Sequence, residues 1–253
     1  MGRVSSTEEL GGGVSVTFKV TLEDGTSGNF KLDERNRIGR PEHEVAAWEV
    51  AKQVGMEDMV PAAVIRVIDN PSPPPTFGDF IVGMARRKGR PVWGGVDGDP
   101  SKMRGSFTEW MDGSPADRIV ATVGAGIFGD SEHDVMRAAM FDFIIGNADR
   151  HGGNWVVDDG KIRLIDHNRA FASGNLGGWR VSSFTRRLTL EPTGVGPAAY
   201  AKPYLDKKPH ILAALVRVGV DNARVAEVSK RIDWAVSAGR WDSLEKMYPK
   251  APA

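Results

Sequence analysis

Three polar residues, Asp149, Asn154 and Asp166, have the types and the spacing that could support chemistry. A long apolar run predicts a helix over about residues 132–146, and the irregular loop after it carries a carboxylate, an imidazole and a carboxamide. A hairpin expected over residues 154–166 then returns the chain. This return places Asp166 at the end of a strand, near Asn154.

Phosphoryl transfer requires such a set of side chains. One carboxylate positions the attacking hydroxyl and accepts its proton, while an asparagine oxygen and a second carboxylate hold the hard cations that neutralise a triphosphate. The step of five residues from Asp149 to Asn154 equals the step from Asp to Asn in the protein-kinase catalytic loop. The spacing therefore favours transfer of a phosphoryl group from a nucleoside triphosphate.

Two other interpretations of this loop stay open at the level of the residues. A polar turn with capping residues explains its glycines and its asparagine, but not an Asp-Arg-His triplet and a second Asp flanking a hairpin. A metallohydrolase would hold a catalytic metal with His151 and the carboxylates of Asp149 and Asp166. The five histidines, however, show no His-x-x-x-His or His-Glu-x-x-His spacing.

The N-terminal part has the patterns of strands and one helix. Residues 13–32 alternate apolar and polar side chains and are expected to form two strands, with a tight turn at Asp24-Gly25. A helix is expected over residues 41–54, since Pro41 suits a first helical turn. Further strands are expected over residues 59–68 and 78–85.

The C-terminal part is expected to be mainly helical, with helices over about residues 198–218 and 222–238 in addition to the one before the loop. A strand-rich first half followed by a helix-rich second half predicts an α+β fold with two lobes.

A family resemblance follows from these residues. The run Asp149-Arg150-His151-x-x-Asn154, followed twelve residues later by Asp166, resembles the catalytic and metal-binding loops of phosphatidylinositol 3- and 4-kinases. It is similar also to the HipA-type bacterial serine/threonine kinases and to the secretory-pathway casein kinases of the same atypical protein-kinase-like group. The resemblance implies a bilobal protein-kinase-like fold, with ATP in the crevice between an N-terminal lobe of residues 1–108 and a helical lobe of residues 109–253.

The resemblance also implies roles for residues of the loop. Asp149 would be the general base, and Asn154 and Asp166 would bind Mg²⁺. His151 would contact the transferring phosphoryl group, and Arg150 would brace the loop. After Asp166 the sequence departs from the family, since it reads His-Asn where Phe-Gly or a similar pair is commoner.

Upstream of the loop, a lysine strand and a glutamate helix of that group have counterparts in Lys31 and Glu44. Lys31 would hold the α- and β-phosphates of ATP, and Glu44 would orient Lys31. The resemblance assigns the phosphate loop and the adenine contacts to a further set of residues: Gly11, Gly12, Gly13, Trp110 and Met111.

Composition restricts the possible partners. The 33 basic and 33 acidic residues cancel, which argues against a nucleic-acid partner. No apolar run is long enough for a membrane span, there is no cysteine, and a cytoplasmic location is expected. The sequence gives no indication of oligomeric state.

The expected activity is that of a kinase, an ATP- and Mg²⁺-dependent phosphotransferase with an alcohol group as acceptor. A serine or threonine of a protein is the first choice of acceptor. A lipid or small-molecule hydroxyl is the alternative, and nucleotidyl transfer stays open. A nucleotide-binding pseudokinase is a third interpretation, although the complete set of candidate residues argues against it.

Overall fold

The structure is a computed structural model of the 253-residue chain. It describes residues 4–10, 17–33, 40–69, 102–115, 132–147, 149–158, 160–172 and 196–240. The glycines Gly11, Gly12 and Gly13 and the strand expected over residues 78–85 lie outside the described residues.

The chain divides into two compact units. Unit 1 consists of Met1–Val45 and Ala62–Met111, and unit 2 of Ala46–Pro61 and Asp112–Ala253. One unit boundary therefore passes through the helix α1 (Pro41–Val54).

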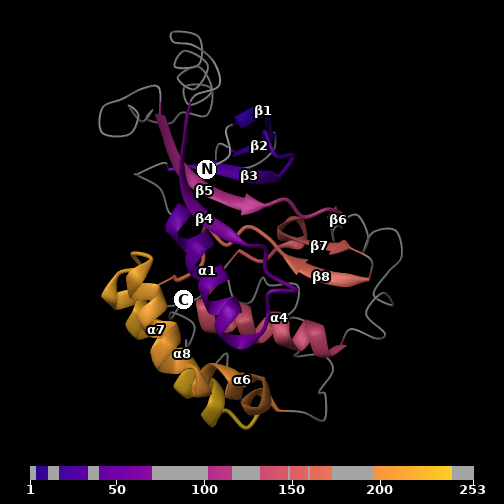
Figure 1. The fold of residues 1–253 in the computed structure, drawn as a ribbon. Coiled ribbons are helices and arrows are strands. Elements are labelled where there is room, and N and C mark those ends of the chain that lie inside the picture. The colour runs from indigo at the N-terminus through magenta and orange to yellow at the C-terminus, as the bar shows by residue number, and fades with distance from the viewer. Residues whose placement is uncertain are drawn as a thin grey trace, which may run out of the picture. The chain divides into compact units, whose positions relative to one another are not determined.

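Unit 1 contains an antiparallel five-stranded sheet (Figure 1). Its strands are β1 (Val4–Glu9), β2 (Thr17–Leu22), β3 (Ser27–Leu32), β4 (Ala63–Asp69) and β5 (Lys102–Glu109). They lie in the order β1-β2-β3-β5-β4, so β5 inserts between two strands that precede it in the chain. The hairpin of β2 and β3 is confirmed, and Gly25 in its turn has a φ of +84°.

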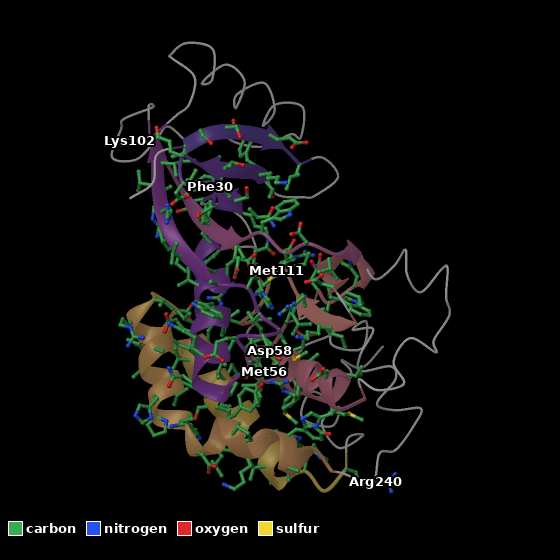
Figure 2. The ribbon with its side chains drawn as sticks, turned by 45° about the vertical axis from the view of Figure 1, so that its right-hand side comes forward. Phe30, Met56, Asp58, Lys102, Met111 and Arg240 are labelled. Carbon is green, nitrogen blue, oxygen red and sulfur yellow. The ribbon has the colours of Figure 1, made fainter. Side chains whose placement is uncertain are left out.

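The two faces of this sheet differ in polarity because side chains alternate along each strand. Phe30, labelled in Figure 2, lies opposite Phe18 on β2 and Phe107 on β5, and all three are buried in an apolar cluster. Lys31 is the next residue along β3 and points to the other face, where Ser106 of β5 is its cross-strand partner. The sheet thus buries one face in a core of its own and presents Lys31 on the other.

Three features of the sheet differ from the sequence-based expectation. Strands β1 and β5 were not predicted, and β4 begins at Ala63 rather than at residue 59. The apolar residues Met59 and Val60 are buried in a turn that packs into the core of unit 2, not in a strand. Their apolar character reflects burial, which alone does not distinguish a strand from a turn.

Helix α1 forms over the predicted residues. Pro41 occupies its first turn together with two acidic residues, which suit the positive end of the helix dipole. Gly55 follows its last residue with a φ of +69°, the left-handed conformation that ends many helices. Arg137 of unit 2 donates to the carbonyl of Gly55 at 2.7 Å and forms an ion pair with Asp58, labelled in Figure 2.

Unit 2 combines a small sheet with helices. The sheet has the order β6-β7-β8, with β6 (Ser114–Pro115), β7 (Trp155–Asp158) and β8 (Lys161–Leu164). Besides the C-terminal part of α1, the helices described in this unit are α4 (Glu132–Ile145), the short 3₁₀ helix η2 (Gly152–Asn154), α6 (Pro197–Asp206), α7 (Lys208–Arg217) and α8 (Asn222–Ser237). Figure 1 shows α6, α7 and α8 packed together at the C-terminal end of the described chain.

The helices of unit 2 follow the predictions with one correction. Helix α4 and helix α8 form as expected, and α4 is buried along most of its length in the core. The single helix expected over residues 198–218 is wrong, because the structure contains two helices separated at Lys207. Pro209, in the first turn of α7, has no amide hydrogen, and its ring would clash with the carbonyl of Leu205 in a continuous helix.

Candidate active site

In unit 1, Lys31 and Glu44 form a buried ion pair. The ammonium of Lys31 on β3 lies 2.6 Å from Glu44 Oε1 in the first turn of α1, and their side chains are 12% and 2% exposed. Two opposite charges so far from solvent hold each other in a defined geometry, because separating them would leave an uncompensated buried charge. The structure therefore brings together the two residues that the resemblance pairs.

Arg104 on β5 fixes the helix that carries Glu44. Its guanidinium donates to Asp33 at 2.5 Å and to Glu42 at 2.6 Å, and its carbonyl accepts from the amide of Asp33 at 2.9 Å. Burial alone would raise the pKa of Glu42, but the hydrogen bond and charge of Arg104, together with a backbone hydrogen bond, hold that pKa below its ordinary value. Arg104 thus ties the start of α1 to the sheet, two residues before Glu44.

This contact predicts a pH-dependent contribution to stability. Because the pKa of Glu42 is lower in the folded chain, its contribution is present near neutral pH and is lost as the pH falls through the folded pKa, below the ordinary value of 4.5. Glu42→Gln is expected to lower the free energy of unfolding by about 1 kcal/mol at neutral pH, since the pair is partly exposed, and by less under acid conditions. Denaturant unfolding at about pH 7 and about pH 3.5 would measure the difference. An equal loss at both pH values would contradict the assignment, and Glu57→Gln, at an exposed turn position, is the control.

In unit 2, a buried arginine organises the loop after α4. Arg150 Nε donates to Asp142 Oδ2 at 3.0 Å, and both side chains are 0% exposed. Arg150 Nη1 donates to the carbonyl of Ile165 at 2.5 Å and also to that of Asn154. One side chain therefore joins α4 to the start of the hairpin and to the residue before Asp166.

The loop itself is held by short-range hydrogen bonds. Asn147 Oδ1 accepts from the amide of Asp149 at 3.1 Å, and the carbonyl of Asp149 accepts from Asn154 Nδ2 at 2.7 Å. The second bond fixes the orientation of the Asn154 amide. The Asp149 side chain is half-buried, so its carboxylate can reach a partner from solution.

His151 has a local role in addition to any contact with a phosphoryl group. Its Nδ1 accepts from the amide of Gly153 at 3.1 Å and caps the 3₁₀ helix η2. The neutral ring then carries its hydrogen on Nε2, and the residue is exposed.

Asp166 follows β8 in a left-handed backbone conformation, with a φ of +59°. Asp tolerates this conformation better than most residues, and such backbone strain clusters at functional sites. The amide of Ile165 donates to the carbonyl of Asn154 at 3.0 Å. Asp166 is the next residue after Ile165, so the two candidate metal ligands are close along the paired backbone. The hairpin therefore brings Asn154 and Asp166 together, as the sequence predicted.

The chemistry of these donors fits Mg²⁺ or a similar hard divalent cation. Asn154 and Asp166 offer an amide and a carboxylate oxygen, and within the described ranges no group of three or more His, Cys, Asp or Glu residues could hold a metal ion. Mg²⁺ commonly takes one or two protein oxygens and completes its shell with water and substrate phosphates. A two-residue site of this kind fits that pattern.

Trp110 and Met111 are the last residues of unit 1. The amide of Trp110 donates to the carbonyl of Ser27 at 3.1 Å, and the ammonium of Lys19 lies 4.2 Å from the centre of its indole ring. The ring is therefore ordered against the face of the sheet that also carries Lys31. Adenine contacts at these residues and phosphate contacts at Gly11, Gly12 and Gly13, which lie outside the described residues, stay predictions.

Sequence reasoning assigned no role to several arginines and carboxylates that position the site. Asp142 interrupts the apolar run of α4, and a carboxylate at a buried helical position was a usable signal of a buried partner. Arg231 of α8 donates to the carbonyl of Ala172, close to the glycine that ends α4. Arg104 gave no such signal, because its partners Asp33 and Glu42 are distant in sequence.

Comparisons with known proteins identify the fold. No family model and no curated protein sequence matches the chain. Solved structures of protein-kinase-like fold do match over 97% of its length. Together with an antiparallel sheet in the N-terminal part and helices in the C-terminal part, this match confirms an α+β protein-kinase-like fold.

The similar structures belong to the atypical branch of this fold. The Golgi casein kinase with Mn and ADP bound is 14% identical, with a TM-score of 0.50 over 73% of its chain. A second structure of the Golgi casein kinase is 16% identical, with a TM-score of 0.51 over 74% of its chain. Fam20 from hydra with sugar is 15% identical, with a TM-score of 0.53 over 86% of its chain.

These likenesses show the fold alone. None of these three structures is a phosphatidylinositol kinase or a HipA-type kinase, so those parts of the resemblance stay predictions. In the part of the chain that the structure describes, no helix is long and apolar enough to cross a membrane. The cytoplasmic location stays a prediction.

Proposed function

We propose that this chain is an ATP-dependent kinase that uses Mg²⁺ or a similar divalent cation and phosphorylates a hydroxyl group, with a serine or threonine of a protein as the preferred acceptor. Support comes from the kinase-like fold and from the residues that the two units hold in place. Golgi casein kinase, a protein of similar fold, was solved with Mn and ADP.

One observation carries the proposal. Arg150, itself fixed by Asp142, donates to the carbonyls of both Asn154 and Ile165. The buried guanidinium of Arg150 therefore holds the backbone of the two loops that contain the candidate metal ligands. A polar turn without a function would gain little from it, because a buried ion pair is a weak source of net stability.

The reaction assigns each residue a task. Lys31, held by Glu44, binds the α- and β-phosphates of ATP. The acceptor hydroxyl donates to Asp149, and its oxygen attacks the γ-phosphorus; the new O–P bond forms as the bond from that phosphorus to the oxygen of ADP breaks. The hydroxyl proton passes to an Asp149 carboxylate oxygen and then to solvent, and ADP leaves with the electron pair of the broken bond.

Asn154 Oδ1 and the Asp166 carboxylate would hold the metal. A bound divalent cation neutralises the charge of the phosphates and aligns them for attack. The protein's part is to present these oxygens at fixed positions, which Arg150 achieves through the backbone of both loops.

The decisive test is incubation of the purified protein with Mg²⁺ and ATP labelled at either the γ- or the α-phosphate, with protein, lipid and small-molecule acceptors in parallel. We expect γ-label on the protein or on a protein acceptor, and no α-label. Label from the α-phosphate would indicate nucleotidyl transfer instead. Label on a lipid or small molecule would correct the acceptor, and no label with no nucleotide binding would refute the kinase assignment.

Asp166→Ala is expected to weaken Mg²⁺-dependent binding of ATP by at least about tenfold, because one of two protein ligands is lost. Titration calorimetry with ATP, with and without Mg²⁺, would measure this effect. Binding measured without Mg²⁺ should stay unchanged. Asp206→Ala, at an exposed ion pair with Lys202 on α6, is the matched control and should bind as the original chain does. Equal Mg²⁺-dependent affinity of Asp166→Ala and the original chain would remove Asp166 from the metal site.

A further inference from the structure

A further charged side chain, Arg169, lies beside the candidate general base Asp149. Arg169 Nη1 lies 3.1 Å from Asp149 Oδ2, and the two side chains are 43% and 28% exposed. Arg169 follows the candidate metal ligand Asp166 by three residues, so both belong to one short segment after β8. The reaction described above gives Arg169 no task.

The backbone that carries Arg169 is anchored on both sides. Before it, the buried ring of His167 packs edge-on against an aromatic ring of α4, and its carbonyl accepts from the amide of Ala170 at 2.9 Å. After it, the amide of Phe171 donates to the carbonyl of Ile145, the last residue of α4, at 2.6 Å. The turn therefore delivers the guanidinium to Asp149 from a fixed base.

The ion pair is too exposed to be a strong stabilising contact. Ion pairs of this exposure contribute little to stability, and a more strongly charged anion can replace Asp149 as the partner of the guanidinium. Arginine is suited to such an exchange because its planar fork binds two oxygens of a phosphoryl group at once. In phosphoryl transfer the charge is spread over the three equatorial oxygens of the group in flight, beside the residue that receives the acceptor hydroxyl.

We propose that Arg169 is a catalytic residue that binds the transferring phosphoryl group, leaving Asp149 once the nucleotide brings that group to the site. This inference rests on the proposed function. The acceptor hydroxyl then takes the place of the guanidinium at Asp149, and the guanidinium turns to the phosphoryl oxygens. Arg169 keeps its proton and forms no covalent bond; it contributes only charge and two hydrogen-bond donors.

The contact between Arg169 and Asp149 would lower the reaction rate if its role were inhibitory. An Arg169 that only blocked Asp149 would slow the reaction, and its removal would raise the rate. A surface ion pair with no part in the reaction would leave both rate and nucleotide affinity unchanged. These alternatives give three different results with one variant, which makes Arg169→Ala the informative change.

The experiment compares the original chain with Arg169→Ala, Arg169→Lys and the control Arg217→Ala, which removes an exposed arginine paired with Glu49 on the same unit. Affinity is measured for MgADP alone and for MgADP with aluminium fluoride, which occupies the position of the phosphoryl group in flight. We expect Arg169→Ala to bind MgADP within about twofold of the original chain and the fluoride complex at least about tenfold more weakly. The affinity of Arg169→Lys for the fluoride complex should lie between those of the original chain and Arg169→Ala, since lysine keeps the charge but lacks the planar fork of donors.

Turnover gives the second readout. Arg169→Ala should lower kcat by at least about 100-fold with little change in KM for ATP, and added guanidinium should restore part of the rate. Equal affinity of Arg169→Ala and the original chain for the fluoride complex, or faster turnover of the variant, would overturn the proposal. If the original chain transfers phosphate and the variant matches it, this inference alone fails. If the original chain neither binds MgADP nor transfers phosphate, the proposed function fails and this inference with it.

Discussion

Asp149→Asn is expected to lower the rate of phosphoryl transfer by about 10²- to 10⁴-fold while leaving Mg²⁺-dependent ATP binding almost unchanged. The substitution keeps the size of the side chain but removes its ability to accept the proton of the acceptor hydroxyl. The backbone contacts of residue 149 use its amide and carbonyl, so the loop should keep its conformation. Initial rates with γ-labelled ATP and titration with ATP would measure the two quantities.

Two controls separate a chemical effect from a structural one. Asp206→Asn makes the same change at an exposed position on α6 and should leave the rate intact. Thermal unfolding of Asp149→Asn should match that of the original chain. A variant that transfers phosphate at the original rate would remove the role of general base from Asp149, and a variant that no longer binds ATP would show that Asp149 acts in binding.

Local patterns in the sequence predicted the elements that local chemistry decides. Helix α1 begins at Pro41 and ends before Gly55 because proline lacks a usable amide hydrogen and glycine accepts a positive φ. The hairpin turn at Gly25 has the same kind of cause. The loop that carries Asp149 and Asn154 could be predicted because its polar residues lie at a recognisable spacing between an apolar helix and a pair of strands.

Strand β5 shows why the rest could not be predicted. Its residues do not alternate cleanly, since four successive residues from Gly105 to Thr108 are buried between two neighbouring strands. Position 105 requires glycine because a Cβ there would collide with the carbonyl of Lys31 on β3. That reason exists only once the strands are paired, and the chain gives no local sign of it.

Long-range ion pairs were hidden for the same reason. Arg104 contacts Asp33 and Glu42, which are 71 and 62 residues away in sequence. Neither spacing has a local meaning, so only the sheet reveals that one arginine fixes the start of α1. Sequence therefore indicated which residues could act, and the fold indicates which residues hold them.

Three of the positioning residues are arginines. Arg104 fixes the helix that carries Glu44. Arg150 fixes the backbone of Asn154 and Ile165. Arg231 donates to the carbonyl of Ala172, at the end of the segment that follows Asp166. A guanidinium has five donors in a plane and can join several acceptors that come from different elements. Arginine is therefore suited to holding loops, whose carbonyl groups have no regular partners.

Asp142→Ala is expected to lower the free energy of unfolding by about 3–5 kcal/mol, the largest stability effect that we predict. Asp142 and Arg150 are both completely buried, and removing the carboxylate leaves the guanidinium inside unit 2 without its charged partner. Denaturant unfolding of the variant and of Asp206→Ala would measure the effect against a control at an exposed aspartate. A loss below about 1 kcal/mol would contradict the buried pair.

The double variant Asp142→Leu with Arg150→Met separates stability from catalysis. Apolar residues in place of a buried ion pair can restore most of the lost stability, because no charge then stays in the core. The carbonyls of Asn154 and Ile165 would still lose their shared donor, so only the bond from the Ile165 amide to the Asn154 carbonyl would join the two loops at this point, and the metal ligands would be held less rigidly. We therefore expect the free energy of unfolding to return close to that of the original chain, while Mg²⁺-dependent binding of ATP is weaker than in the original chain. Recovery of both properties would mean that the pair serves the fold alone, and that Arg150 has no part in positioning the metal ligands.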